Sequence, residues 1–412
     1  MPESTSADII KNTASSKVIA LPELMEHIGH HMHQSDQASC TLVSRSWNEI
    51  FTPLLWNTID TQSKPWRKIM HKCDTGEIER DEFEGRCKAI FAKHGHLIRH
   101  LAAHWNTILE AASLNTSNCK KLLSFSTEVV RYSHVTPTTV LALVIDDALD
   151  HKENGDNNNN VDGNEEDDEQ QPQLFPWVSE DGMNKFKEDI RHRGTVERFF
   201  ILIRQNPGLI RLQFPMHGVM KDVSKEYVFE TLSHLRSLKE LNLVWLPLDI
   251  PTLLDTVPQL QRLQGHDLPG LGSLQHDYPS LRVLDIRAWV KFTQLLDVLK
   301  HLPRLEKLRM ESVLGDLESV VPYKEACRIA ETTPPFSQLR SLQVDNQLRP
   351  GDKYILLFLR LIPNLVRLEN LTIVYKVKQA LWEHCYYLDD IRIVGGPDVE
   401  LWRERRAKDG RQ

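Results

Sequence analysis

The chain has 412 residues, 41% of them hydrophobic and 26% charged, and a formal net charge of −7. A chain of this length has room for two or three domains and can bury a sizeable core. Its balance gives no overall basic field, so we expect no nucleic-acid partner. No stretch approaches the ~20 apolar residues that span a bilayer, and residues 1–17 lack the apolar core of a signal peptide, so we expect no membrane partner.

The acidity of the chain is local. Between His151 and Glu169 there are eight acidic residues and one lysine. The net charge of this segment is therefore −7, the same as that of the whole chain. The cysteines are scattered and form no C-x-x-C pair, which argues against a zinc site and a disulfide framework and favours a reducing compartment. We therefore expect a cytoplasmic or nuclear protein, or one found in both. The cysteines are Cys40, Cys73, Cys87, Cys119, Cys327 and Cys385.

Residues 18–58 follow a polar, Ser/Thr-rich stretch over 1–17 that we expect to be a disordered tail. Pro22 suits the first position of a helix, where its missing N–H costs nothing. One apolar stripe at helical spacing consists of Leu21, Leu24, Ile28 and Met32, and a second of Leu42, Val43, Trp47, Ile50 and Phe51. Ser35 or Asp36 is expected to cap the second helix, and Pro53 to end it. So short a unit cannot bury both stripes internally, and the remaining apolar surface predicts a partner.

The motifs of this segment resemble those of an F-box. The corresponding residues are Leu21-Pro22-Glu23, Ser35-Asp36, Val43-Ser44-Arg45-Ser46-Trp47 and Pro53-Leu54-Leu55-Trp56. In many family members a further residue separates the proline from the glutamate. The resemblance implies that the segment binds a Skp-family adaptor protein and, through it, a cullin ligase. The implied adaptor-binding residues are Leu21, Pro22, Leu24, Ile28, Met32, Leu42, Val43, Trp47, Pro53, Leu55 and Trp56. The alternative is an ordinary helical hairpin that caps the next domain.

Residues 59–95 begin with a short extended piece and continue with a Lys/Arg/Glu mixture, which predicts a helical connector. From residue 96 the spacing Leu-x-x-Leu-x-Leu recurs. The clear copies begin at Leu209, Leu238, Leu281, Leu305, Leu339, Leu368 and Leu388, a truncated copy begins at Leu260, and degenerate copies begin at Ile98 and Leu122. Amphipathic segments of helical period lie between the copies, and several end in a proline just before the next leucine.

A strand and a helix repeated every twenty to thirty-odd residues resemble the unit of a leucine-rich-repeat solenoid. One unit cannot cover its own leucines, so neighbouring units must stack. The irregular spacing is most similar to the ribonuclease-inhibitor-like repeats found behind F-boxes. The expected fold class is therefore α/β: a short N-terminal helical F-box module followed by an irregular, curved leucine-rich-repeat solenoid. We place degenerate repeats at 96–145 and the main solenoid at 174–396; the alternative is a non-repetitive α/β domain with leucine-rich strands.

Residues 146–173 interrupt the repeats with an acidic, Asn-rich stretch that has almost no apolar side chains to offset the entropy of ordering. We expect a disordered insertion that acts as a solubilising loop, or alternatively an acidic recognition motif. The basic segment 397–412 is expected to be a frayed tail, with nuclear import as the alternative.

Within each repeat, the residue between the last two leucines is expected to face outward on the concave sheet. These outward residues and their neighbours mix both charge signs with indole rings, as protein-binding surfaces do. We therefore predict that they bind a target protein as a group; for any one of them taken alone, a solvated strand position is the preferred interpretation. They are Asn242, Trp245, Asp285, Arg287, Trp289, Arg309, Glu311, Gln343 and Asp345.

Motifs for catalysis are missing from the sequence. Gly270-Leu271-Gly272 lacks the third glycine and the lysine of a phosphate loop, and there is no G-x-S-x-G elbow or kinase set. His27, His30, His31 and His33 form one candidate metal cluster, but the same helix needs its apolar face, which favours a solvated polar face. We expect no enzyme, no metal and no cofactor.

Together these patterns predict a substrate-recognition adaptor of a Skp–cullin–F-box ubiquitin ligase. It would dock on the adaptor protein through residues 18–58 and hold a target protein on the solenoid for ubiquitination and degradation. Two alternatives remain: an F-box scaffold without ubiquitin transfer, and a leucine-rich-repeat protein that binds partners without any adaptor. The identity of the target does not follow from the sequence.

Overall fold

The computed structural model describes residues 21–127, 190–214, 223–243, 246–266, 268–314, 323–344, 353–369, 384–385, 387–388 and 390–392. The predicted tails at 1–17 and 397–412 and the acidic insertion at 146–173 lie outside these residues. The chain is mixed α/β with parallel strands, and it divides into two compact units. The first unit comprises residues 1–136 and 194–206, and the second comprises 137–193 and 207–412.

The first unit begins with three short helices, and the two predicted apolar stripes fall partly within the first and the third of them and partly in the turns beside them. Its elements are α2 (Pro22–His30), α3 (Gln34–Cys40), α4 (Arg45–Asn57), β1 (Thr58–Asp60), α5 (Lys64–Asp74), α6 (Arg80–His94), η2 (Gly95–Leu97), β2 (His100–Ala102), α7 (Asn106–Ser113), η3 (Asn115–Ser117), β3 (Ser124–Ser126) and most of α10 (Ile190–Gln205). β1 pairs with β2, and β2 with β3, all parallel. Ile59, Leu101 and Phe125 occupy equivalent positions in the three strands and are all buried.

Two details of these helices differ from the sequence prediction. α3 starts at Gln34 with His33 as its N-cap, so neither Ser35 nor Asp36 caps it. The capping residue is instead Ser44, whose side chain accepts a hydrogen bond from the Trp47 N–H at 3.3 Å at the start of α4. The prediction that Pro53 ends this helix was wrong, since α4 continues through it to Asn57.

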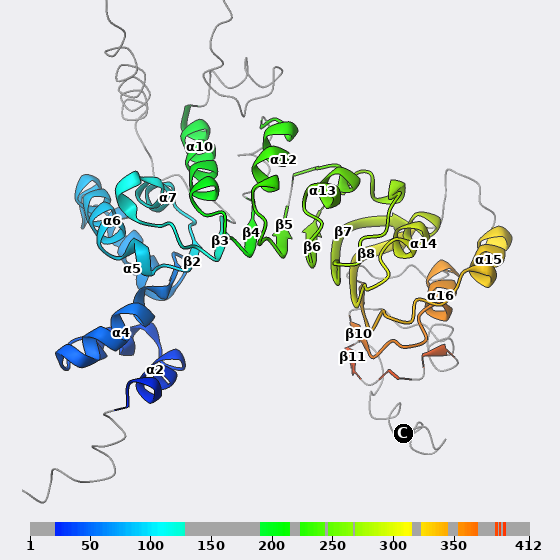
Figure 1. Cartoon of the computed structure of the whole chain (residues 1–412), viewed down its shortest axis with the longest axis horizontal. Helices are drawn as coiled ribbons and strands as arrows, with labels where there is room; N and C mark the ends of the chain where they lie inside the picture. The colour runs from blue at the N-terminus through cyan, green and yellow to red at the C-terminus, as the bar shows by residue number, and fades with distance from the viewer. Residues whose placement is uncertain are drawn as a thin grey trace, which may run out of the picture. The chain divides into compact units, whose positions relative to one another are not determined.

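The second unit contains the predicted alternation of strands and helices. Its elements are β4 (Arg211–Gln213), α12 (Lys225–Ser233), β5 (Glu240–Asn242), α13 (Ile250–Thr256), β6 (Arg262–Gly265), η4 (Leu271–Ser273), β7 (Val283–Lys291), α14 (Phe292–Lys300), β8 (Lys307–Leu314), α15 (Tyr323–Thr332), β9 (Ser341–Val344), α16 (Lys353–Arg360), β10 (Arg367–Glu369) and β11 (Asp390–Arg392). Each strand from β4 to β11 pairs in parallel with the next one along the chain. In Figure 1, α12 and α13 lie on the same side of β4, β5 and β6.

The middle leucine of each copy lies in register with that of its neighbours. The aligned residues are Leu212, Leu241, Leu263, Leu284, Leu308, Leu342, Leu368 and Ile391. Those from Leu212 to Leu368 are at most 2% exposed. The backbone before each strand from β5 to β10 repeats one hydrogen-bond pattern. Before β8, for example, the N–H groups of Glu306 and Lys307 both donate to the carbonyl of Arg282, at 2.9 and 3.0 Å. Because these bonds recur from repeat to repeat, each of these strands is held in register by the strand before it.

This register corrects one predicted copy. Leu368 was predicted to be the first leucine of its copy, but it pairs with Leu342, which is the middle one. The copy therefore begins at Leu365, directly after the turn at Pro363-Asn364. The copy that begins at Leu305 likewise has a proline two residues before its first leucine. The proline therefore indicates the start of the copy more clearly than the leucines do.

Among the helices of the described segments, none has the length and apolar character needed to cross a membrane.

Candidate functional site

The helices α2, α3 and α4 form a small core of their own. Met25, Cys40 and Phe51 are its buried centre, and Met32, Trp47, Ile50 and Leu54 pack partly buried against it. Gly29 allows α2 to approach α4, because a Cβ at this position would overlap the side chain of Leu54. The side chain of Gln37 donates to the Gly29 carbonyl at 2.7 Å and ties α3 to α2. The predicted stripes thus contribute to an internal core that fixes the three helices.

Four large apolar side chains of this segment remain on the surface. Leu21 is 51% exposed, Ile28 43%, Leu42 86% and Val43 61%. Leu21 is the N-cap of α2 and Ile28 lies within that helix, while Leu42 and Val43 lie in the turn between α3 and α4. Elsewhere in the described residues, only Ile69 and Tyr387 are exposed large apolar side chains. We call Leu21, Ile28, Leu42 and Val43 the exposed apolar surface.

The other predicted adaptor-binding residues differ in how available they are. Pro22 and Pro53 are exposed, and Leu24 and Leu55 are half-buried. Met32 and Trp47 pack against the core, where the Trp47 ring lies 5.5 Å from that of Phe51. Met32 and Trp47 thus stabilise the core that supports the exposed residues.

Trp56 has a different neighbour. Its ring stacks on His94 at the end of α6, with the ring centroids 4.5 Å apart and the planes 7° from parallel. Burial lowers the pKa of His94, and the positive charges of Lys93 and His96 lower it further. The last residue of the F-box-like motif therefore joins α4 to the following helical connector.

A second candidate surface runs across the sheet of the second unit. The residue that follows the middle leucine of each copy lies in register with its neighbours and forms what we call the outer row. The row consists of Gln213, Asn242, Gln264, Asp285, Arg309, Gln343, Glu369 and Arg392. The sequence predicted Asn242, Asp285, Arg309 and Gln343 as target-binding residues, and the structure brings these four together. The prediction missed Gln264 and Glu369, which the register of the truncated and the shifted copy would have identified. It also left out Gln213 and Arg392, which occupy the same position in two of the clear copies.

Charges on this face are arranged in pairs between neighbouring strands. Arg309 reaches Asp285 at 3.5 Å, and Asp285 is only 4% exposed. Close to the row, Arg211 pairs with Glu240 at 3.0 Å and Arg282 with Glu306 at 2.8 Å. The last two pairs are largely exposed and contribute little stability. The three pairs together give this face alternating positive and negative charge.

The remaining predicted target-binding residues do not belong to the outer row. Glu311 is half-buried in β8, and Arg287 and Trp289 lie within β7. β7 and β8 pair over a longer stretch than the other strands, with a register irregularity between Ile286 and Trp289. Trp245 and Asp345 lie outside the described residues.

The described residues contain no group of three or more His, Cys, Asp or Glu side chains that could hold a metal ion. The rings of His27 and His31 touch edge to face, with their centroids 5.2 Å apart. Burial raises the pKa of Cys87, Cys119 and Cys385 to about 12. These three thiols therefore stay protonated at neutral pH and are poor nucleophiles.

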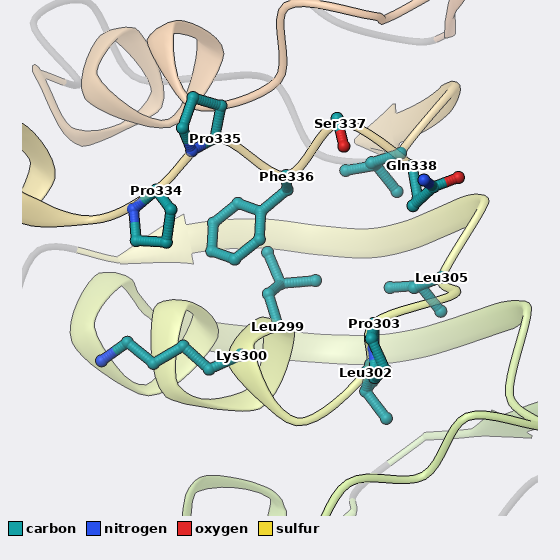
Figure 2. Close-up of a pocket in the computed structure, with 11 residues that line it drawn as sticks. Leu299, Lys300, Leu302, Pro303, Leu305, Pro334, Pro335, Phe336, Ser337 and Gln338 are labelled. Carbon is teal, nitrogen blue, oxygen red and sulfur yellow. The ribbon is translucent and has the colours of Figure 1, made fainter.

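An apolar depression of about 230 Å³ lies between the end of α14 and the segment that leads into β9. Figure 2 shows the ring of Phe336 turned toward Leu299, with Pro334 and Pro335 beside it. Lys300 is the charged residue of the lining, and it pairs with Asp297 at 2.9 Å. The lining offers packing but no acid–base pair for chemistry.

Comparison with models of known protein families gives no match, and comparison with curated protein sequences gives no relative. The resemblance to F-box and leucine-rich-repeat proteins therefore rests on the motifs of this chain.

Proposed function

We propose that the chain is a non-catalytic substrate-recognition adaptor that docks on a Skp-family protein through α2–α4 and presents a target protein for ubiquitination. The observation that carries the proposal is the exposed apolar surface. Leu42, in the turn before α4, is 86% exposed and so contributes little to the core of the three helices. Exposed apolar side chains gathered in one short segment mark a protein interface more often than a random surface.

The energy available at this surface suits a stable complex. Burial of one leucine or isoleucine side chain is worth roughly 1.5–3 kcal/mol relative to exposure. Leu21, Ile28, Leu42 and Val43 are between 43% and 86% exposed, so a partner that covers them recovers much of that energy. The core beneath them holds their positions before binding, which reduces the ordering cost of association.

The second half of the proposal is that the strands form a leucine-rich-repeat-like solenoid whose outer row holds the target. Three features support it: the strands pair in chain order, the middle leucines are in register, and helices such as α12, α13 and α14 alternate with the strands. Neighbouring repeats then bury a continuous apolar core, and the opposite side of each strand is left as one extended polar face. Alternating Asp, Arg, Gln and Glu side chains along that face suit a mixed-charge protein surface.

The mechanism that follows is proximity. The adaptor links the chain to a cullin ligase, and the outer row holds the target close to the ubiquitin-loaded enzyme. Holding both partners raises the effective concentration of the acceptor lysine without any catalytic group from this chain.

The docking step is tested by binding of the purified full chain to a Skp-family adaptor, measured by calorimetry. Leu42→Ser together with Val43→Ser should weaken binding at least ten-fold, because two apolar contacts are lost while the core of α2–α4 is untouched. Ile69→Ser is the matched control, since Ile69 is an exposed apolar residue on α5 outside the surface. Equal affinity of the double variant and the wild type, with unchanged melting temperatures, would rule out this surface as the docking site.

A further inference from the structure

A recess of about 270 Å³ in the first unit has no role in the function proposed above. It lies where α2 and the end of α4 meet the segments that precede β2 and β3. Its charged lining residues are Arg99, Lys121 and Glu26, and His30, His96 and Asn57 add further polar groups. None of these six belongs to the exposed apolar surface or to the outer row.

Arg99 is held in place by both its backbone and its side chain. Its backbone N–H donates to the Asn57 carbonyl at 2.9 Å, and its Nη1 donates to the Lys121 carbonyl at 3.2 Å. A guanidinium has five N–H donors, and one contact leaves most of them available. The recess therefore contains a preoriented fork donor, the geometry that binds phosphate and carboxylate groups best.

The charge of the lining favours an anion. Within the described part of the chain, neither Arg99 nor Lys121 forms an ion pair, and Glu26 is the only acidic residue of the recess. His30, His96 and Asn57 can donate further hydrogen bonds. With two cations outside ion pairs and several neutral hydrogen-bond donors, the recess is expected to bind an anion more favourably than water.

The size and the remaining walls narrow the ligand class. Ligand pockets usually measure about 300–1,000 Å³, so this recess suits a small group. Pro53, Leu54 and Leu97 form an apolar wall beside the cationic side. A phosphate monoester combines a compact dianion with a short carbon stem, and it complements both sides of the recess.

We infer that this recess is a binding site for a phosphate monoester, carried either by a small molecule or by a phosphorylated side chain of a protein. The phosphoryl group contacts Arg99 and Lys121, and the carbon stem lies against Pro53 and Leu97. A bound ligand touches α2 and α4 on one side and the segments before β2 and β3 on the other. Binding therefore stabilises the attachment of the helices to these strands.

The test uses the full chain, with glycerol phosphate, inorganic phosphate and a tripeptide with a central phosphoserine as probes, in calorimetry and thermal melts. Sodium chloride at matched ionic strength controls for general screening. We expect the esters to bind more tightly than inorganic phosphate and to raise the melting temperature above that in chloride. Tighter binding of the tripeptide than of glycerol phosphate identifies a protein source, and the reverse order identifies a small molecule.

Three variants make the test specific. Lys121→Ala should weaken ester binding at least ten-fold, whereas Lys120→Ala removes the same charge one residue away, outside the recess, and should leave affinity unchanged. Glu26→Gln removes the opposing carboxylate and should tighten binding several-fold. The inference is overturned if the esters and chloride give equal melting temperatures, or if Lys120→Ala weakens binding as much as Lys121→Ala does.

Discussion

At the scale of single residues, Asn206 shows how a side chain can replace missing backbone partners. It is 1% exposed, and its Oδ1 accepts from the Leu122 N–H at 2.8 Å. Its Nδ2 donates to the carbonyls of Cys119 and Leu202, each at 2.8 Å. Asn206 thus joins the end of α10 to the segment before β3, two parts of the first unit that are far apart in sequence.

Asn206→Ala should destabilise the first unit strongly. It leaves the Leu122 N–H and the Cys119 carbonyl without this partner in a buried place, and each unsatisfied group costs about 1–3 kcal/mol. Asn364→Ala is the comparison, because Asn364 is half-buried and donates one bond, to Ser337 at 2.8 Å. Urea unfolding of both variants measures the difference; a smaller loss for Asn206→Ala than for Asn364→Ala would contradict the assigned role.

His94 gives a prediction for pH. Its pKa is lowered below the ordinary value of 6.5, first by burial and then by Lys93 and His96. The unfolded chain therefore binds a proton more readily than the folded chain does. The stabilising contribution of His94 is complete above pH 6.5 and is lost as the pH falls through the folded pKa.

His94→Gln should make the melting temperature fall less between pH 7.5 and pH 5 than it does in the wild type. Since the His94 ring stacks on Trp56, the tryptophan fluorescence of the wild type should also change in this window. An identical pH dependence in both proteins would show that His94 has no part in it.

At the scale of elements, α4 shows where local sequence rules gave the wrong boundary. Proline lacks an N–H and its ring crowds the carbonyl four residues earlier, so Pro53 predicted a helix end. The helix continues because Phe51, which is 0% exposed, and Leu54 pack into the core on either side of Pro53 in the sequence. Packing of the apolar face outweighs one lost hydrogen bond, an outcome that depends on tertiary contacts.

Two substitutions in α4 should change stability in opposite directions. Pro53→Ala restores an N–H in the helix interior and should stabilise the chain, by at most about 3 kcal/mol. Ser44→Ala removes the N-cap and should destabilise it by about 0.5–2 kcal/mol. Thermal melts of the two variants check the signs; a lower melting temperature for Pro53→Ala would show that the proline fits its surroundings better than alanine.

The strands were more predictable than the helix ends. Alternation of apolar and polar residues predicted Leu241 in the core and Asn242 on the outward face, and the structure has them there. The structure extends the same alternation to Leu263 and Gln264 in the next strand. Leu263→Ala should therefore cost about 2–5 kcal/mol, whereas Gln264→Ala should lie within about 0.5 kcal/mol of the wild type. Urea unfolding distinguishes the two, and similar losses for both would contradict the assigned alternation.

At the scale of the whole molecule, the sequence predicted the alternation of strands and helices because each copy carries its own leucine spacing, followed by an amphipathic segment of helical period. It did not predict that β1 extends the sheet of the first unit, since Ile59 is a single apolar residue in a short polar stretch. Nor did it predict the recess around Arg99, whose lining residues lie between Glu26 and Lys121 and meet only after folding. Sites assembled from distant residues leave no periodic signal in a single sequence.

The proposed function depends most on one link, from the exposed apolar surface to a cullin ligase. The most direct measurement is the amount of cullin subunit that co-purifies with the full chain from cells, for the wild type and for the Leu42→Ser, Val43→Ser variant. The proposal predicts that cullin accompanies the wild type and the Ile69→Ser control and is lost from the double variant, although all three stay folded. Cullin missing from the wild type, or bound equally by the double variant, would contradict the proposal.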